Sequence, residues 1–144
     1  VGRVQGLLAR FLTLPIPTAA AVAGHAFGAG AMLAIAHDFR VMRADRGYFC
    51  FPEVDIRIPF TPGMAALIQA KRTPQAAVAS MTTGRRFGGP DAAAHGIVDQ
   101  TAAEGGVTAA ATDLLRPLGG KDSGTLGAIK QVMFGPAVQA LQNP

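Results

Sequence analysis

A short apolar run that breaks at a glycine-rich turn constrains the fold of this chain more than any other feature. Residues 18–23 (TAAAVA) are small and mostly apolar, residues 24–30 (GHAFGAG) hold three glycines, and residues 31–36 (AMLAIA) are apolar again. This order predicts a strand, a tight loop and a helix. Glycine lets the backbone approach a ligand closely, and the first N–H groups of a helix have no acceptor inside the helix. The turn is therefore a candidate site for an anion, or for an oxygen that becomes anionic during a reaction.

A single carboxylate follows the next apolar run. Residues 48–52 (YFCFP) lead directly to Glu53. Apolar surroundings disfavour the ionised form and raise the pKa of a carboxyl group, which makes Glu53 a candidate base. A solvated glutamate at the end of a strand is the alternative, and the spacing leaves both open. A dinucleotide-binding loop is a further alternative for the turn, although Leu33 stands where the motif G-x-G-x-x-G needs its third glycine.

Composition indicates a folded, globular chain and bears on the kind of partner it has. Its 144 residues make one domain, with 49% hydrophobic and 15% charged residues. The formal net charge is +4, but the basic residues are scattered and no aromatic side chains interleave with them. We therefore expect no nucleic-acid partner, whereas an anionic small ligand fits the charge better.

The uncharged run between Arg10 and Asp38 raises the question of a membrane helix. Pro15, Pro17 and the glycines divide it into pieces too short to span a bilayer, so no membrane partner is expected. Cys50 is the only cysteine, so an internal disulfide is impossible and a reducing compartment such as the cytoplasm is expected. No Cys or His stands at metal-ligand spacing from it, and we expect no metal site.

The remaining pattern predicts a series of short elements. They are a helix over 1–13, a strand over 38–42 paired as a hairpin with a strand over 48–51, a proline-rich loop over 54–63, and a helix over 64–71. Next come a helix from Pro74 to Gly84 capped by Thr73, a short helix over 90–95, a strand-like piece at 97–98, and helices over 104–118 and 126–134. The inward face of the helix from Pro74 to Gly84 is expected to carry Ala77, Val78 and Met81. The inward face of the helix over 126–134 is expected to carry Leu126, Ile129, Val132 and Met133.

Several separated motifs together resemble one family. They are residues 17–30 (PTAAAVAGHAFGAG), 34–40 (AIAHDFR), 51–53 (FPE), 84–87 (GRRF), 91–93 (DAA) and 96–99 (GIVD). Their order and types resemble the enoyl-CoA hydratase/isomerase (crotonase) family over at least residues 15–100. The resemblance implies an α/β fold, a ββα spiral with a C-terminal helical region, in which the N-terminal part of the fold is apparently missing. It further implies a partial spiral core over 1–100 and a helical oligomerisation region over 101–144, which builds homotrimers or dimers of trimers.

The resemblance also implies a chemistry, the stabilisation of the enolate of an acyl-CoA thioester by two backbone N–H groups. By position, the Ala29 N–H is one of these donors, and Gly28 and Gly30 beside it admit the thioester. The second donor belongs to an upstream motif that these 144 residues lack. Coenzyme A is then part of the substrate, and no separate cofactor is expected.

The choice among the family's activities depends on its two glutamate positions. Hydratases of the family use two glutamates, but Met32 stands at the first position and only Glu53 is kept at the second. A double-bond shift needs one base, and residues 53–56 (EVDI) look like the peroxisomal-type isomerases. The resemblance thus implies a Δ3,Δ2-enoyl-CoA isomerase of fatty-acid β-oxidation with Glu53 as base, peroxisomal if the source is eukaryotic. Asp55 is a weaker second carboxylate, which strand-like alternation would place on the same side as Glu53.

An acyl pocket and two other functions complete the expectations. We expect Met32, Pro52, Ile58, Phe60 and Met64 to contact the substrate. The alternatives are a hydratase or another crotonase activity, and a non-catalytic protein that binds acyl-CoA.

Overall fold

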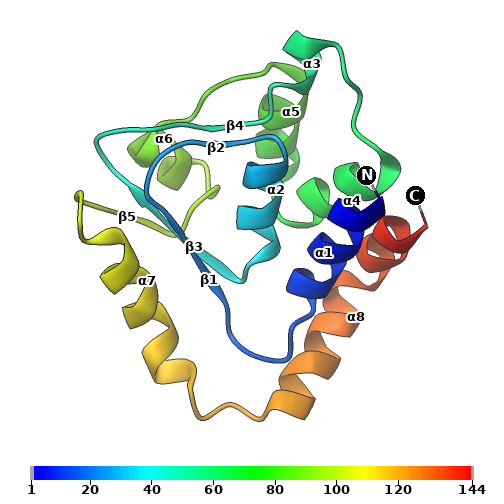
Figure 1. Cartoon of the computed structure of the whole chain (residues 1–144), viewed down its shortest axis with the longest axis vertical. Coiled ribbons are helices and arrows are strands. Elements are labelled where there is room, and N and C mark those ends of the chain that lie inside the picture. The colour runs from blue at the N-terminus through cyan, green and yellow to red at the C-terminus, as the bar shows by residue number, and fades with distance from the viewer. Residues whose placement is uncertain (1, 144) are drawn as a thin grey trace.

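Two small parallel sheets lie at the centre of the molecule, and helices surround them (Figure 1). The computed structural model describes residues 2–143. One sheet has the order β1-β3-β5, formed by β1 (Ala19–Val22), β3 (Phe39–Arg43) and β5 (Gln100–Ala102). The other consists of β2 (Ala26–Phe27) and β4 (Phe49–Cys50). The registers pair Ala19 with Phe39 and Ala26 with Phe49.

Helices make up most of the rest of the described chain. They are α1 (Gly2–Leu12), α2 (Ala29–Ala36), α3 (Glu53–Ile56), α4 (Pro62–Ala70), α5 (Pro74–Thr82), α6 (Gly89–Ala94), α7 (Val107–Leu115) and α8 (Ser123–Gln142), with a 3₁₀ turn at Arg116–Leu118. The predicted cap is confirmed, because the Thr73 hydroxyl accepts a hydrogen bond from the Ala76 N–H and Pro74 follows it. The α/β class is confirmed as well.

The main hydrophobic core lies around α2, which α1, α4 and the sheets cover. Leu12, Ile35, Phe49 and Leu67 are fully or almost fully buried in it. α8 packs along α1 and α4 and closes the core on one side (Figure 1). A Cβ on Gly63 would lie 2.8 Å from the Cα of Leu141, so glycine is what allows α4 and α8 to come this close.

The predicted hairpin of residues 38–42 and 48–51 is wrong. β3 has β1 on one edge and β5 on the other, so β4 has no edge of β3 to pair with. β4 instead pairs in parallel with β2, in the second sheet. The segment between β3 and β4 passes close to the glycine-rich turn, since a Cβ on Gly47 would lie 2.5 Å from the carbonyl carbon of Gly24.

Three further expectations about the elements need correction. The strand-like piece at 97–98 is not a strand, because the N–H groups of Ile97 and Val98 donate hydrogen bonds to the carbonyl of Ala92 in α6. The strand follows at 100–102. The proline-rich loop begins with the short helix α3. The last helix extends well beyond 126–134 on both sides. The helix expected over 1–13 is present as α1, although Val1 lies outside the described residues, as does Pro144.

The predicted inward face of the last helix is also wrong. Val132 is 83% exposed, and Ile129 and Met133 are exposed too. The buried positions are instead Lys130, Phe134, Ala137, Val138 and Leu141. The Lys130 ammonium finds acceptors in the carbonyls of Leu14 and Ile16, which allows a charged residue to take an inward position. Val78 of α5, likewise expected inside, is exposed. The division of the chain at residue 100 stays a prediction.

Candidate functional site

The glycine-rich turn presents the start of α2 at the surface. Gly28 follows β2 with φ +55° and ψ −121°, a conformation that favours glycine. Its N–H donates to the Cys50 carbonyl (3.1 Å), and its own carbonyl accepts the Met32 N–H (3.0 Å). Ala29 and Gly30 are exposed, and as first-turn residues their N–H groups have no acceptor inside the helix. An oxygen atom of a ligand can therefore accept from the Ala29 N–H.

Glu53 reaches this turn because β4 runs parallel to β2. β4 ends at Cys50, and Glu53 begins α3 three residues later. A Cβ placed on Gly28 would lie 3.9 Å from Glu53 Oε2, so the carboxylate and the start of α2 are neighbours. The structure thus brings together Glu53, Gly28 and, next in the chain, the predicted donor Ala29.

The Glu53 carboxyl group is buried and incompletely satisfied. The residue is only 9% exposed, and Oε1 has no hydrogen-bond partner among residues 2–143. Burial raises the pKa of Glu53, and a hydrogen bond with its own backbone N–H opposes this effect. A carboxylate with a raised pKa and a free oxygen can accept a proton from a ligand.

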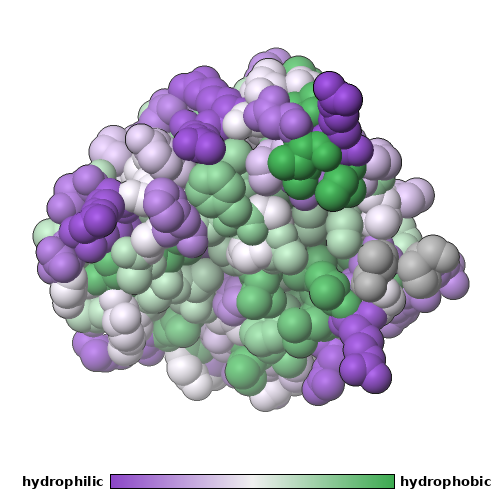
Figure 2. Space-filling model, turned by 45° about the horizontal axis from the view of Figure 1, so that its top comes forward, coloured by the Kyte–Doolittle hydropathy of each residue, from purple (hydrophilic) through white to green (hydrophobic). Residues whose placement is uncertain are grey.

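A cavity of about 290 Å³ opens beside Glu53. It is lined by Glu53, Val54, Arg57, Ile58, Pro59, Phe60 and Met81. Ile58 and Phe60, two of the residues expected to contact the substrate, thus line this cavity. Hydrophobic side chains gather on the surface around α3 and the loop that follows it, which carry the exposed Val54, Ile56 and Ile58 (Figure 2).

Sequence reasoning did not predict four residues of this cavity, Val54, Arg57, Pro59 and Met81. Of these, Met81 is the one that comes from a distant part of the chain. The helical spacing marked it as a core residue of α5, but nothing in the spacing said which cavity α5 borders. Other expected contacts lie elsewhere. Met32 is buried in the hydrophobic core, Met64 packs on the edge of that core, and Pro52 is the half-buried residue before α3. None of these three lines the cavity beside Glu53, and their contact with a substrate stays a prediction.

Asp55 does not share a side with Glu53. The expectation assumed a strand, but residues 53–56 are helical, and residues two apart on a helix point about 200° away from each other. The Asp55 side chain is instead exposed and lies against Gly84, whose φ is +69°. A Cβ on Gly84 would collide with the Asp55 carboxylate, so the glycine accommodates it.

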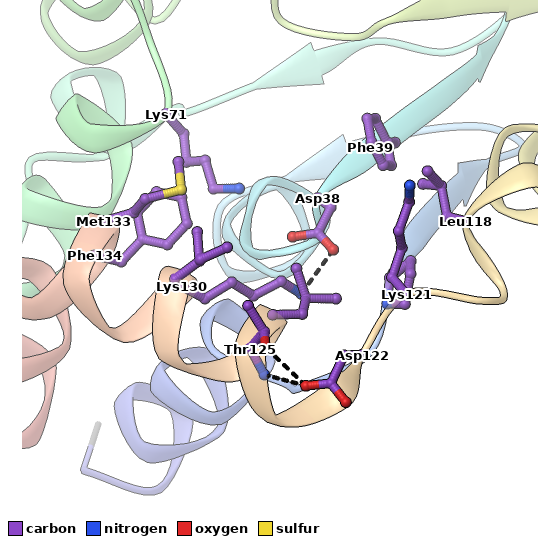
Figure 3. A pocket seen from close by; sticks show the side chains of 13 residues that line it. Asp38, Phe39, Lys71, Leu118, Lys121, Asp122, Thr125, Lys130, Met133 and Phe134 are labelled. Atoms are coloured by element: carbon purple, nitrogen blue, oxygen red, sulfur yellow. Dashed lines mark hydrogen bonds and ion pairs between the residues drawn. The ribbon is translucent and has the colours of Figure 1, made fainter.

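Another cavity shares no lining residue with the cavity beside Glu53 (Figure 3). It measures about 540 Å³ and lies between α8 and the start of β3. The Lys130 ammonium pairs with Asp38 there at 2.7 Å, and Asp122 caps α8 through the Thr125 N–H. Burial lowers the pKa of Lys71 to about 8. Lys130 thus connects α8 with the segment before β1 and with Asp38 after α2, and Lys71, which follows α4, donates to the His37 carbonyl.

Residues 2–143 contain neither a metal-ligand cluster nor a membrane-spanning helix. No three His, Cys, Asp or Glu side chains are grouped so that they could hold a metal ion. No helix in this part of the chain combines the length and the apolar character that a membrane span requires.

Comparison with known proteins gives relatives that are named as enzymes of CoA thioesters. "Enoyl-CoA delta isomerase 2, peroxisomal" of Arabidopsis thaliana is 40% identical over 118 residues, which are 80% of this chain and 49% of that protein. "Enoyl-CoA delta isomerase 3" of the same plant is 43% identical over 107 residues, 72% of this chain and 45% of that protein. "Carnitinyl-CoA dehydratase" of Escherichia coli K12 is 35% identical over 127 residues, 87% of this chain and 48% of that protein. The chain thus spans about half the length of these relatives.

Solved structures agree with the fold. The crystal structure of a probable enoyl-CoA hydratase from Mycobacterium tuberculosis matches with a TM-score of 0.90 at 25% identity, over 99% of this chain and 60% of that one. Human mitochondrial Δ3,Δ2-enoyl-CoA isomerase also has a TM-score of 0.90, at 20% identity, over 99% of this chain and 58% of that one, and so supports the fold alone. The model of the family described as enoyl-CoA hydratase/isomerase matches residues 2–143, and this chain belongs to that family.

Proposed function

We propose that the protein is a Δ3,Δ2-enoyl-CoA isomerase with Glu53 as its base. The observation that carries this proposal is the position of the Glu53 carboxylate, buried, with one oxygen free, and beside the exposed start of α2. Met32 stands one turn further along α2, so that helix offers no second carboxylate to the site. The names of the two Arabidopsis relatives support the same activity.

The proposed reaction uses one proton acceptor and one oxyanion site. The thioester oxygen accepts a hydrogen bond from the Ala29 N–H, which stabilises negative charge on that oxygen. Glu53 removes a proton from C2, and the electron pair of the broken C–H bond is delocalised over the dienolate. Glu53 then returns the proton to C4, which leaves a double bond between C2 and C3. No atom is gained or lost, and one carboxylate performs both proton transfers.

The proposed site has one N–H donor, that of Ala29, whereas the mechanism that the family resemblance implies uses two. Removal of one such donor typically costs about 10²–10³ in rate. We therefore expect these 144 residues alone to be slow or inactive, and the experiments below use the longest polypeptide that contains them.

Hydration is the second candidate, because a relative is named as a dehydratase. The two activities separate in one experiment, which measures isomerisation of a 3-enoyl-CoA and hydration of a 2-enoyl-CoA by the same preparation. We expect the wild type to isomerise the 3-enoyl-CoA, and we expect Glu53→Gln to lower the rate of isomerisation by about 10²–10⁴-fold. Asp55→Asn is the matched control, since its carboxylate is exposed and lies against Gly84, and it is expected to keep its activity.

The outcomes of this experiment are distinct. Full isomerase activity in Glu53→Gln would remove Glu53 from the role of base. Hydration without isomerisation would favour the second candidate. Binding of acyl-CoA without turnover of either substrate would favour a non-catalytic binding protein.

We also propose a homotrimer built through the outward face of α8. Support comes from the side chains of Ile129, Val132 and Met133, which are apolar and exposed. Neighbouring apolar side chains on a surface are typical of protein–protein interfaces. Light scattering measures the molar mass in solution. The wild type is expected to have the mass of a trimer, and Val132→Glu is expected to have the mass of a monomer. For the location of the protein we propose the cytoplasm or the peroxisome, where the free thiol of Cys50 stays reduced.

A further inference from the structure

Arg72 is a buried cation without a hydrogen-bond partner. It follows α4, is 8% exposed, and all three guanidinium nitrogens are buried without an acceptor among residues 2–143. Arg40 shows the usual arrangement, since its Nε donates to the Ile97 carbonyl and its Nη1 to the His37 carbonyl, each at 2.8 Å. A buried charge without acceptors is costly, and proteins normally provide it with partners. The partner of Arg72 is therefore to be sought outside the described residues.

The neighbours of Arg72 hold its cation but do not neutralise it. Its guanidinium carbon lies 5.2 Å from the ring centre of Phe49 and 5.9 Å from that of Phe51. Aromatic faces attract a cation, but they leave the in-plane N–H donors free. Burial, and then the positive charge of Arg40, lower the pKa of Arg72 to about 9, so the side chain still carries its charge at neutral pH.

Arg72 lines a cavity of about 400 Å³ whose other walls are mostly apolar. The lining residues are Gln69, Arg72, Pro74, Ala77, Val78, Met81 and Thr82. A volume of this size is typical of small-ligand pockets, in which a few polar groups fix the orientation of an apolar ligand.

This cavity borders the one beside Glu53. Met81 lines both cavities. Phe51, which lies against the Arg72 guanidinium, packs edge-on against Phe60 with 6.0 Å between ring centres, and Phe60 lines the Glu53 cavity. The two cavities are therefore neighbours that share Met81 as a wall, and Phe51 and Phe60 connect the surroundings of Arg72 with those of Glu53.

We propose that the distal end of the acyl chain occupies the second cavity and that Arg72 binds a carboxylate there. The substrates would then be acyl-CoA thioesters of dicarboxylic acids, and this assignment rests on the proposed function. The flat guanidinium fork matches a carboxylate with two parallel hydrogen bonds. The apolar walls suit a methylene chain, and the contact with the Glu53 cavity favours the acyl end of the ligand over its nucleotide end.

Binding of unreactive ligands tests this proposal apart from turnover. We would titrate the protein calorimetrically with adipoyl-, suberoyl- and sebacoyl-CoA, and with hexanoyl-, octanoyl- and decanoyl-CoA of matching chain length. These acyl groups are saturated, so no isomerisation can occur. We expect at least one dicarboxylic member to bind roughly 30-fold more tightly than its monocarboxylic counterpart, because a buried charged contact commonly contributes that much.

Three variants assign the preference to the guanidinium. Arg72→Met is expected to abolish it while the monocarboxylic ligands bind as before. Arg72→Lys keeps the charge without the fork and is expected to keep a smaller preference. Arg46→Met removes an exposed charge elsewhere and is the control that leaves the preference unchanged.

The opposite results would overturn the proposal. Equal affinity of the wild type for the dicarboxylic and the monocarboxylic ligands would do so. An equal loss of affinity for the two kinds of ligand in Arg72→Met would do so as well. If Arg72→Met does not fold, the proposal is still tested by the affinities of the wild type for the two kinds of ligand and by the preference of Arg72→Lys. Failure of the Glu53→Gln experiment would leave a binding preference intact, so the two proposals fail separately.

Discussion

The interaction of Lys130 with Asp38 gives the sharpest prediction of stability. Lys130 is 3% exposed, and its ammonium lies 2.7 Å from Asp38 Oδ2 (Figure 3). It also lies 2.8 Å from each of the carbonyl oxygens of Leu14 and Ile16. Lys130→Met keeps most of the aliphatic stem and removes all three interactions. The variant therefore measures what the ammonium contributes to stability, apart from what the aliphatic stem contributes to the packing of α8.

The size of the effect follows from what is left behind. Removal of one partner of a buried ion pair costs about 3–5 kcal/mol, because the other charge stays buried. The Asp38 side chain is 17% exposed and still accepts the Thr18 N–H, so the lower end of that range applies to it. The two carbonyls lose a donor as well. We expect the free energy of unfolding to fall by about 3 kcal/mol.

Urea denaturation followed by circular dichroism measures this loss. Lys121→Met is the matched control, since Lys121 lines the same cavity but is exposed, and a change below about 0.5 kcal/mol is expected. A loss of less than 1 kcal/mol in Lys130→Met would show that the three contacts add little to stability and do not explain the inward position of Lys130.

Three further predictions concern packing and pH. Gly63→Ala should destabilise the protein by about 1–3 kcal/mol in the same assay, since its Cβ would lie 2.8 Å from the backbone of Leu141, whereas Gly135→Ala, in open space, should not. Because burial raises the pKa of Glu53 above its ordinary 4.5, Glu53→Gln should be more stable than the wild type at pH 7, and the difference should vanish as the pH falls below that ordinary value. The lowered pKa of Lys71, about 8 against 10.5, means that the unfolded chain binds more protons between these values, so stability should rise with pH there and rise less in Lys71→Met.

Local patterns predicted the elements well and their partners poorly. The caps and prolines that begin α5 act within one turn, and the sequence therefore locates that helix. The pairing of β4 depends on which edges are free, and β3 has none left, which no spacing between 38 and 51 can reveal. The burial of α8 was misjudged for a related reason. Lys130 is buried because distant carbonyls surround it, while Val132 is exposed because no described segment covers it.

The candidate site was predictable to the extent that it follows family motifs in the turn and around Glu53. Ile58 and Phe60 follow Glu53 closely in the chain, so their place in the cavity was within reach of sequence reasoning. Met81 and Arg72 come from α5 and the segment before it, and only the packing of α5 against α3 brings them near. Asp55 was misjudged because a helix of one turn replaced the expected extended chain.

The parallel pairing of β2 and β4 is what creates the site. In a hairpin with β3, the end of β4 would lie beside the start of β3, and Glu53 would be far from the glycine-rich turn. Parallel strands instead end at the same edge, so Gly28 and the segment that leads to Glu53 leave the sheet side by side. Each strand is only two residues long, but Phe49 also exchanges two backbone hydrogen bonds with Phe87, at 2.8 and 2.9 Å. β4 is therefore fixed from both sides, and this is why so short a strand can hold the Glu53 carboxylate at a defined distance from the start of α2.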